Sequence, residues 1–268
     1  MAEPAQGEAD VSGATPRRAT RARHDALVVL LREGVDSVET LAERVGVSPS
    51  TVRRDLTSLQ REGRIARTYG GAMVRDGFHE RSFSESSLID RQAKAAIAAT
   101  AAELVPPGAT VFLDAGTTCL ALARVLAERG PLKVATRGLE VALLLTRVPD
   151  VEVVLVGGQV QPLSHGMVGP LAAMVLDRLA FDAAFLGADV VDPVKGLGEP
   201  TVDETYVKER AAGRATDVYL LADASKLGPA NVDAWIPLDP AWTLVTDSAA
   251  SRDLVAAFQA RGLRVLVA

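Results

Sequence analysis

Apolar residues recur at helical spacing in three short segments of the first 75 residues, and glycines separate these segments. The three predicted helices bury Ala26, Leu27, Leu30 and Leu31, then Val38, Leu41, Ala42 and Val45, then Val52, Leu56 and Leu59. Ser37 can cap the second helix, and Ser48 followed by Pro49 signals the start of the third. Residues 64–74 predict a two-stranded β-ribbon that turns at Gly70–Gly71.

Apolar runs alternate with amphipathic segments through the rest of the chain. A helix is predicted over 91–104, before Pro106–Pro107, and strands over 110–114, 132–135, 152–156, 183–186, 217–221, 242–246 and 264–267. Further helices are predicted near 118–127, 138–145, 169–178, 203–212 and 251–260. This alternation predicts the α/β fold class, a mostly parallel sheet with helices on both faces. Such sheets bind ligands at the carboxyl ends of their strands.

These patterns divide the chain into four segments. Residues 1–19 are rich in Ala, Gly, Pro and acidic residues and predict a disordered tail. Residues 20–75 predict a winged helix-turn-helix, residues 76–90 a polar linker, and residues 91–268 the α/β domain. A winged helix-turn-helix is a DNA-binding arrangement, which makes the distribution of charge the next question.

Charge is segregated along the chain. The net charge of −5 by itself argues against a nucleic-acid partner. Residues 17–75, however, hold 12 Arg and Lys against 7 Asp and Glu, whereas residues 76–268 hold 17 against 24. Non-specific DNA affinity follows local charge, so the basic N-terminal segment is compatible with DNA.

Composition narrows the remaining classes. Cys119 is the only cysteine, which excludes an intrachain disulfide and a cysteine-based metal site. His24, His79 and His165 are scattered without metal-ligand spacing, so we expect neither a metal nor a cofactor. The chain has no apolar run of about 20 residues and no signal peptide, which predicts a cytoplasmic protein without a membrane partner.

The third helix and the ribbon carry the candidate DNA contacts. With its apolar residues facing inward, the helix leaves long cations beside short hydroxyls, a combination suited to base edges and phosphates in a major groove. The predicted contacts are Ser48, Ser50, Thr51, Arg53 and Arg54 from the helix and Arg64, Arg67 and Tyr69 from the ribbon. The alternative is a surface helix with solvated arginines.

A buried strand followed by a Gly-Thr-Thr turn marks a candidate anion site. Unpaired N–H groups at the start of a helix attract phosphate, Gly116 permits close approach, and Thr117 and Thr118 add hydroxyl donors. Asp114 would repel phosphate, and we assign it to sugar hydroxyls or to fixing the loop. In the alternative interpretation, either threonine only caps the helix.

Three later segments place polar groups toward the same sheet edge. Asp189 follows one strand, Lys226 follows another, and Glu204 and Lys208 lie at i, i+4 on one helix face. Such a Glu–Lys pair is more often a surface ion pair, and Asp-containing turns are common for structural reasons. Together with Asp114, Gly116, Thr117 and Thr118, these residues predict a site for a polyol phosphate.

The segment VSPSTVRRDLTSL (47–59), with EGRIARTYGGA (62–72) after it, resembles the DeoR family of transcriptional regulators. The similarity continues through FHER (78–81), the helix that contains Lys94, and the α/β domain, to about residue 250. It implies a C-terminal domain related in fold to ribose-5-phosphate isomerase and CoA transferases. It also implies that Asp114, Gly116, Thr117 and Thr118 line the phosphate end, with Asp189, Glu204, Lys208 and Lys226 near the sugar or the phosphate. Residues 157–160 and Gly169 match as turn and packing residues.

The chain departs from this family's pattern at several positions. Tyr69 stands where histidine is frequent, Arg137 where asparagine is common, and Val190 where glycine is usual. Gly198–Glu199 occupies a position where threonine is common. Apart from Tyr69, these residues lie near the predicted pocket, so the identity of the ligand stays open.

The main hypothesis is a sequence-specific DNA-binding regulator, a repressor of a carbohydrate operon controlled by a phosphorylated sugar. Its partners would be a double-stranded DNA operator, the sugar or polyol phosphate, and further copies of the chain in a dimer or tetramer. The first alternative is a sugar-phosphate isomerase with an appended DNA-binding head, with Glu204 as its general base. The second is a DNA-binding protein whose α/β domain only oligomerises.

Overall fold

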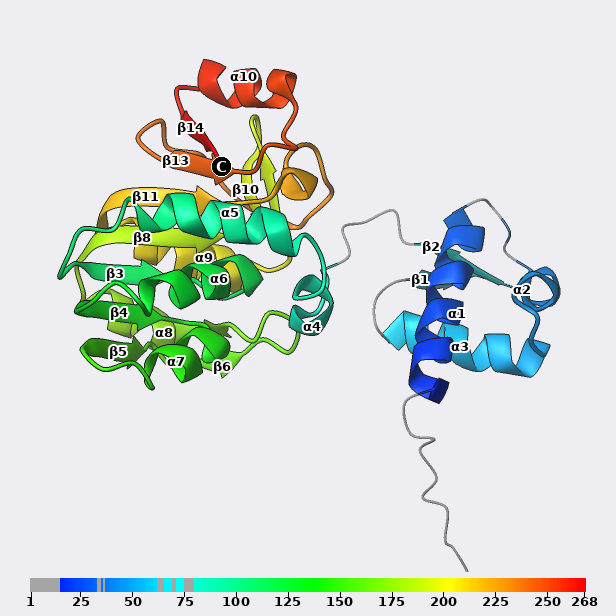
Figure 1. Ribbon diagram of the computed structural model, residues 1–268. Coiled ribbons are helices and arrows are strands. Elements are labelled where there is room, and N and C mark those ends of the chain that lie inside the picture. Colours follow the sequence, from blue (N-terminus) through cyan, green and yellow to red (C-terminus); the bar gives the residue numbers. More distant parts are fainter. Residues whose placement is uncertain (1–14, 33–34, 36, 62–64, 69–70, 75–79) are drawn as a thin grey trace, which may run out of the picture. The chain divides into compact units, whose positions relative to one another are not determined.

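The computed structural model describes residues 15–32, 35, 37–61, 65–68, 71–74 and 80–268. The chain forms two compact units, Met1–His79 and Glu80–Ala268, drawn in Figure 1. Each unit has its own hydrophobic core, so each is described by itself.

The first unit consists of three helices and a ribbon. Helices α1 (Thr15–Arg32), α2 (Val38–Val45) and α3 (Pro49–Arg61) precede strands β1 (Ile65–Thr68) and β2 (Gly71–Val74), which pair antiparallel. The core takes its side chains from all three helices and from β1, among them Leu27, Leu41, Val52, Leu56, Leu59 and Ile65. This is the winged helix-turn-helix arrangement that the apolar stripes predict.

Four details of this unit differ from the prediction. Helix α1 begins at Thr15, inside the predicted tail, because the Arg and Ala residues there favour helix. Ala26 is exposed and Val28 is buried in its place, because the larger side chain takes the inward position beside Leu27. Ser37 stands at the N-cap of α2 without a capping bond and donates to Glu39. Gly71 pairs with Thr68 in the ribbon, so it belongs to the strand rather than the turn.

The second unit is built on a seven-stranded parallel sheet. In chain order its strands are β3 (Thr110–Leu113), β4 (Leu132–Thr136), β5 (Val151–Leu155), β8 (Phe181–Gly187), β11 (Ala215–Leu221), β13 (Thr243–Thr246) and β14 (Arg264–Val267). Their order across the sheet is β14-β13-β11-β8-β3-β4-β5. Every predicted strand is present, and the predicted fold class is confirmed.

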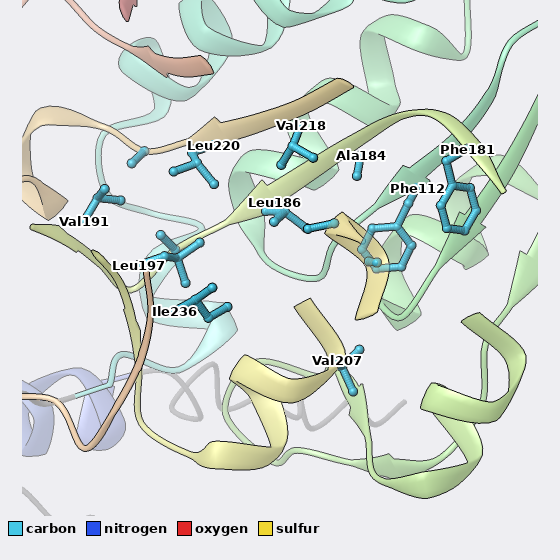
Figure 2. Close-up of a cluster of buried hydrophobic side chains, with 14 of the residues drawn as sticks. Phe112, Phe181, Ala184, Leu186, Val191, Leu197, Val207, Val218, Leu220 and Ile236 are labelled. Carbon is cyan, nitrogen blue, oxygen red and sulfur yellow. The ribbon is translucent and has the colours of Figure 1, made fainter. Parts of the chain in front are cut away.

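Helices cover both faces of this sheet. They are α5 (Arg91–Ala102), α6 (Thr117–Leu126), α7 (Leu139–Leu145), α8 (Pro170–Leu176), α9 (Val202–Ala212) and α10 (Arg252–Ala260). Figure 1 shows α5, α6 and α7 on one side of the sheet and α8 and α9 on the other. Successive side chains of β3 point to opposite faces of the sheet. Val111 and Leu113 pack in the core beneath α5–α7, and Phe112 packs in the core on the other face. In Figure 2, Phe112, Phe181, Ala184 and Leu186 lie in this second core.

Short elements surround the main sheet, and the sequence pattern did not predict them. Strands β9 (Val190–Asp192), β10 (Gly196–Glu199) and β12 (Ala234–Ile236) form an antiparallel sheet, and β6 (Gln159–Val160) pairs with β7 (Met167–Val168). Helix α4 (Phe83–Ser86) lies inside the predicted linker and begins with a capping box between Ser82 and Glu85. These elements have two to four residues, too few for a hydrophobic period to be recognised.

Candidate functional site

The order of the sheet determines where a site can form. Strands β3, β4 and β5 extend the sheet in one direction, and β8, β11, β13 and β14 extend it in the other. The crevice between the carboxyl ends of β3 and β8 is therefore the topological switch point, where parallel sheets bind ligands. A small cleft of about 50 Å³ lies here, which we call the switch-point pocket; it is lined by Ala115, Gly116, Thr117, Thr118, Arg137, Ser164, Gly187, Ala188, Asp189, Glu199, Glu204, Lys208 and Lys226.

Asp114, at the end of β3, forms the floor beneath this pocket. Its carboxylate is completely buried and accepts from Arg137 Nε, from the Ala115 N–H at 2.7 Å and from the Gly187 N–H at 3.1 Å. The Lys208 amine lies 3.1 Å from Asp114 Oδ2. Burial alone would raise the pKa of Asp114, but Arg137 and Lys208 outweigh burial and hold that pKa below its usual range. Asp114 is thus an ionised anchor that joins the two sides of the switch point.

Lys208 is fully engaged in the same network. Besides Asp114, its amine donates to the Gly187 carbonyl at 2.8 Å and to Glu199 Oε1. Burial lowers the pKa of Lys208, but Asp114 and Glu199 reverse that effect and raise it. The i, i+4 neighbour Glu204 is not its hydrogen-bond partner, although both side chains are buried. Helix α9 therefore presents two buried polar side chains to the pocket rather than a surface ion pair.

Donors gather at one end of the pocket. Helix α6 starts there with Gly116 at the N-cap, at φ 102°, and no side chain caps its first N–H groups. A side chain at position 116 would strain this left-handed backbone, so glycine leaves the helix terminus open. Arg137, from the end of β4, borders the same end and is only 2% exposed. This end is suited to an anion.

Carboxylate acceptors also line the pocket. Glu204 accepts from the Ser164 hydroxyl at 3.2 Å and from the Thr201 hydroxyl at 2.9 Å. Asp189 lies 3.8 Å from the Lys226 amine, which also donates to the Ala188 carbonyl. Carboxylates accept hydrogen bonds from hydroxyl groups, so these side chains are suited to a polyol.

Burial and the neighbouring carboxylates shift the pKa of two further carboxyl groups, those of Glu199 and Glu80. Burial raises the pKa of Glu199 to about 7, against the opposing effect of Lys208. Burial, with Asp189, Glu204 and Glu199 nearby, raises the pKa of the half-buried Glu80 to about 8. Glu80 is the first residue of the second unit, so the start of this unit lies within the electrostatic field of the pocket.

The pocket brings together seven of the eight effector residues predicted from the sequence. Gly116, Thr117, Thr118, Asp189, Glu204, Lys208 and Lys226 line it, whereas Asp114 lies beneath it and fixes the loop. The sequence pattern gave no indication of Ser164 as a pocket residue, and it marked Arg137 and Glu199 only as departures from the family pattern. Ser164 lies between the short strands β6 and β7, which gave no signal; the departures at Arg137 and at Gly198–Glu199 were the signals for the other two.

A wider groove lies between α5 and α6, and it contains none of the carboxylates of the switch-point pocket. Ala95, Ala98, Leu120 and Ala121 are among the residues that line it, and its cations include Arg91 and Arg124. Cys119 is buried, and burial raises the pKa of its thiol to about 12, so it is not a reactive thiol. Within the described residues, no cluster of three metal-ligating side chains occurs and no helix is long and apolar enough to cross a bilayer.

The exposed face of α3 holds the other group of predicted site residues. Ser48, Ser50, Arg53 and Arg54 are exposed, and Thr51 is half-buried. The Ser48 hydroxyl accepts from the Thr51 N–H at 3.3 Å, which caps α3. Arg53 forms an exposed ion pair with Glu39 at 3.1 Å. Arg64 and Tyr69 lie outside the described residues, and Arg67 is placed only as a residue of β1.

A buried ionic contact holds α3 against α1. Asp55 accepts from Arg23 Nε at 2.6 Å and lies 3.2 Å from His24 Nε2. Burial raises the pKa of Asp55, but the hydrogen bonds from Arg23 and His24 outweigh burial and lower it overall. Asp55 therefore turns inward while Arg53 and Arg54, beside it in the sequence, stay in solvent.

Both units match known families. Residues 23–77 match the DeoR-like helix-turn-helix domain, and residues 89–248 match the DeoR C terminal sensor domain. The HTH-type transcriptional regulator GlpR of Haloferax volcanii is 34% identical over 86% of this chain and 90% of its own length. The glycerol-3-phosphate regulon repressor of Escherichia coli K12 is 31% identical over 77% of this chain and 82% of its own.

The two units thus define a transcriptional regulator with a DNA-binding head and a sensor domain. The chain belongs to the DeoR family of transcriptional regulators. Among solved structures, ribose 5-phosphate isomerase A from Methanocaldococcus jannaschii aligns with 50% of this chain and 53% of its own, at 22% identity and a TM-score of 0.38. At that TM-score, residue roles cannot be transferred between the two chains.

Proposed function

We propose that this protein represses a carbohydrate operon and that a phosphorylated sugar or polyol in the switch-point pocket controls its affinity for DNA. The observation that carries this proposal is that the pocket combines anion-binding donors, at the start of α6 and at Arg137, with the carboxylates of Asp189 and Glu204. A polyol phosphate offers a group for each: an anion for the donors and hydroxyl groups for the carboxylates. The relative named for the glycerol-3-phosphate regulon supports this class of signal.

The loop of residues 161–166 offers a route from the pocket to the start of the sensor unit. Ser164 contacts Glu204 inside the pocket, and the neighbouring Leu163 carbonyl accepts from the Phe83 N–H at 2.7 Å. His165 stacks on the Phe83 ring with 5.4 Å between ring centroids. Phe83 opens α4, three residues after the unit begins at Glu80. A ligand that moves this loop would therefore move the segment that follows the DNA-binding unit in the chain.

This mechanism is a population shift. A ligand that favours one arrangement of loop 161–166 and α4 changes the fraction of molecules that fit the operator. By linkage, bound operator DNA must weaken ligand binding by the same factor that the ligand weakens DNA binding. No chemical step is required of the pocket residues.

We propose a binding role rather than a catalytic one for Glu204. Its carboxylate is buried between the Ser164 and Thr201 hydroxyls, which fix its position. Incubation of the purified protein with ribose 5-phosphate, with detection of ribulose 5-phosphate, tests this assignment. Formation of the ketose by wild type, and not by Glu204→Gln, would establish an isomerase instead.

A mobility-shift titration tests the regulatory proposal. The protein is bound to its own promoter region and titrated with a panel of phosphorylated sugars and polyols at constant salt, with the unphosphorylated compounds as controls. At least one phosphorylated compound should release the DNA, and its unphosphorylated counterpart should not. Unchanged DNA binding across the whole panel would refute the sensing role, and absence of any protected sequence in footprinting would refute the operator.

A further inference from the structure

Arg137 has an unsatisfied donor inside the switch-point pocket. Its Nε is bound to Asp114, but its Nη1 is buried and has no hydrogen-bond partner among the described residues. The whole side chain is only 2% exposed, so bulk water does not satisfy this donor. A buried donor without a partner is costly, and in a pocket lining it indicates a group that a ligand satisfies.

The position of this donor is closely defined by its neighbours. A Cβ added to Gly166 would lie 2.3 Å from Arg137 Nη1 and 2.9 Å from the Ala115 Cβ. Only glycine at position 166 therefore leaves room for the guanidinium. Ala115 directly precedes Gly116, the N-cap of α6, so the free Nη1 and the open helix terminus are at the same end of the pocket.

The other cations of the pocket are committed elsewhere. Lys208 is held by Asp114, Glu199 and the Gly187 carbonyl, and Lys226 by Asp189 and the Ala188 carbonyl. Burial lowers the pKa of Arg137, but Asp114, Glu199 and Glu204 reverse this effect and raise it, so the guanidinium stays charged at any physiological pH. Arg137 is thus the pocket cation with a buried donor left over for a ligand.

We propose that Arg137 is the specificity-determining residue for the ligand, and that it binds the phosphate of a phosphate monoester jointly with the N-terminus of α6. This inference rests on the proposed function and adds the orientation of the ligand. The phosphate lies at Arg137 and Gly116, and the hydroxyl groups of a short polyol chain extend toward Asp189 and Glu204. The reverse orientation would place hydroxyl groups at the N-terminus of α6 and leave the Arg137 donor without an anion.

Binding of inorganic phosphate tests this assignment without knowledge of the natural ligand. Wild type, Arg137→Lys and the matched control Arg147→Lys, an exposed residue that does not line the pocket, are titrated with phosphate against chloride at equal ionic strength. Calorimetry gives the dissociation constant, and the unfolding temperature without phosphate reports the fold. Lysine keeps a cation for Asp114 but removes the Nη1 donor, so phosphate should bind Arg137→Lys about tenfold more weakly or worse.

Three outcomes decide the proposal. Weaker phosphate binding by Arg137→Lys, with Arg147→Lys unchanged, supports it. Equal binding by wild type and Arg137→Lys overturns it, even if Arg137→Lys unfolds at a lower temperature, because Arg137 is then only structural. Absence of phosphate binding to wild type also overturns it. The proposed function is judged separately, because release of DNA by a phosphorylated compound requires no particular role for Arg137.

Gly166→Ala provides an independent variant that leaves Arg137 in place. The added methyl group occupies the space beside Nη1 and must displace the guanidinium. Phosphate affinity should fall as it does in Arg137→Lys, and the double variant should be little weaker than either single variant because both remove the same contact. Full additivity of the two losses would contradict a shared contact.

Discussion

Arginine has opposite roles in the two units of this protein. In the DNA-binding unit, the Arg53 side chain is 55% exposed and its ion pair with Glu39 lies in solvent. In the sensor unit, Arg137 is 2% exposed and is fixed by a completely buried carboxylate. The first cation is exposed to water and can exchange its partner for a DNA phosphate. The second has already lost its hydration during folding, so it is preorganised for one anion in one place.

The comparison shows what each kind of surface can recognise. Exposed cations attract any polyanion, and this attraction weakens as salt increases. Buried cations are screened much less, and their directional donors select by geometry. A regulator needs both kinds, because it must search along DNA and must also distinguish one small metabolite from others. Substitutions in each unit test this contrast.

The largest effect is expected for Asp114→Asn. This change removes the buried charge between Arg137 and Lys208; Arg137 loses its bound carboxylate, and Lys208 keeps only Glu199. The free energy of unfolding of the sensor unit should fall by about 3–5 kcal/mol. Chemical denaturation of the full chain measures it.

The matched control for this variant is Asp177→Asn, which breaks the half-exposed ion pair with Arg210. A surface pair of this kind contributes about 0–1 kcal/mol, so the control should change little. If Asp114→Asn cost no more than Asp177→Asn, the buried network would not be what holds the switch point together.

The next largest effect is expected for the exposed arginines of α3. Arg53→Ala or Arg54→Ala should weaken operator binding by about 1–3 kcal/mol if the residue reads a base edge. Fluorescence anisotropy with the promoter region, at one fixed salt concentration, measures the dissociation constant. Arg147→Ala in the sensor unit is the control, and unchanged affinity for both α3 variants would exclude the docking of α3 in the major groove.

A smaller effect is expected for Phe83→Ala, which removes the ring that stacks on His165. DNA affinity without ligand should stay near that of wild type, but the phosphorylated compound that releases DNA should do so less effectively, by about 1 kcal/mol of coupling free energy. Paired DNA-binding curves with and without that compound measure this coupling. The control is Leu88→Ala, a change of an exposed residue in the same segment, which should leave the coupling free energy unchanged. Equal coupling free energies in the two variants would disprove the route through Phe83.

The smallest effect concerns pH. Because the pKa of Glu80 is raised to about 8 in the folded protein, the unfolded chain loses this proton first as pH rises. The stability of the sensor unit should therefore fall as pH rises from about 5 to 8, by less than about 1 kcal/mol for this group after solvent screening. Glu80→Gln should flatten the part of the slope between pH 7 and 8, above the pKa of Glu199. An identical slope in the variant would show that Glu80 does not titrate there.

Local pattern predicted most of the fold. Each of the seven main strands is an apolar run bounded by turn residues, and β-structure of that length is recognisable without its partners. Likewise, Val52, Leu56 and Leu59 repeat at helical spacing and are fully buried. Helix α4 and the β6–β7 ribbon could not be predicted, because contacts such as the one between Phe83 and Leu163 stabilise them, rather than a period of their own.

The two-unit plan, the basic character of the first unit and the Gly-Thr-Thr start of α6 follow from local sequence, because these features depend on neighbours along the chain. The roles of three buried residues depend on tertiary contacts. Asp114 is an anchor beneath the pocket, Lys208 is bound to Asp114, Glu199 and the Gly187 carbonyl, and Arg137 keeps a buried donor without a partner among the described residues. Arg137 and Lys208 lie 23 and 94 positions from Asp114, and the order of the strands is what brings them together. Burial makes every unpaired charge or donor costly in free energy. The role of each side chain at the switch point is therefore set by the hydrogen-bond and ion-pair partners around it rather than by its residue type.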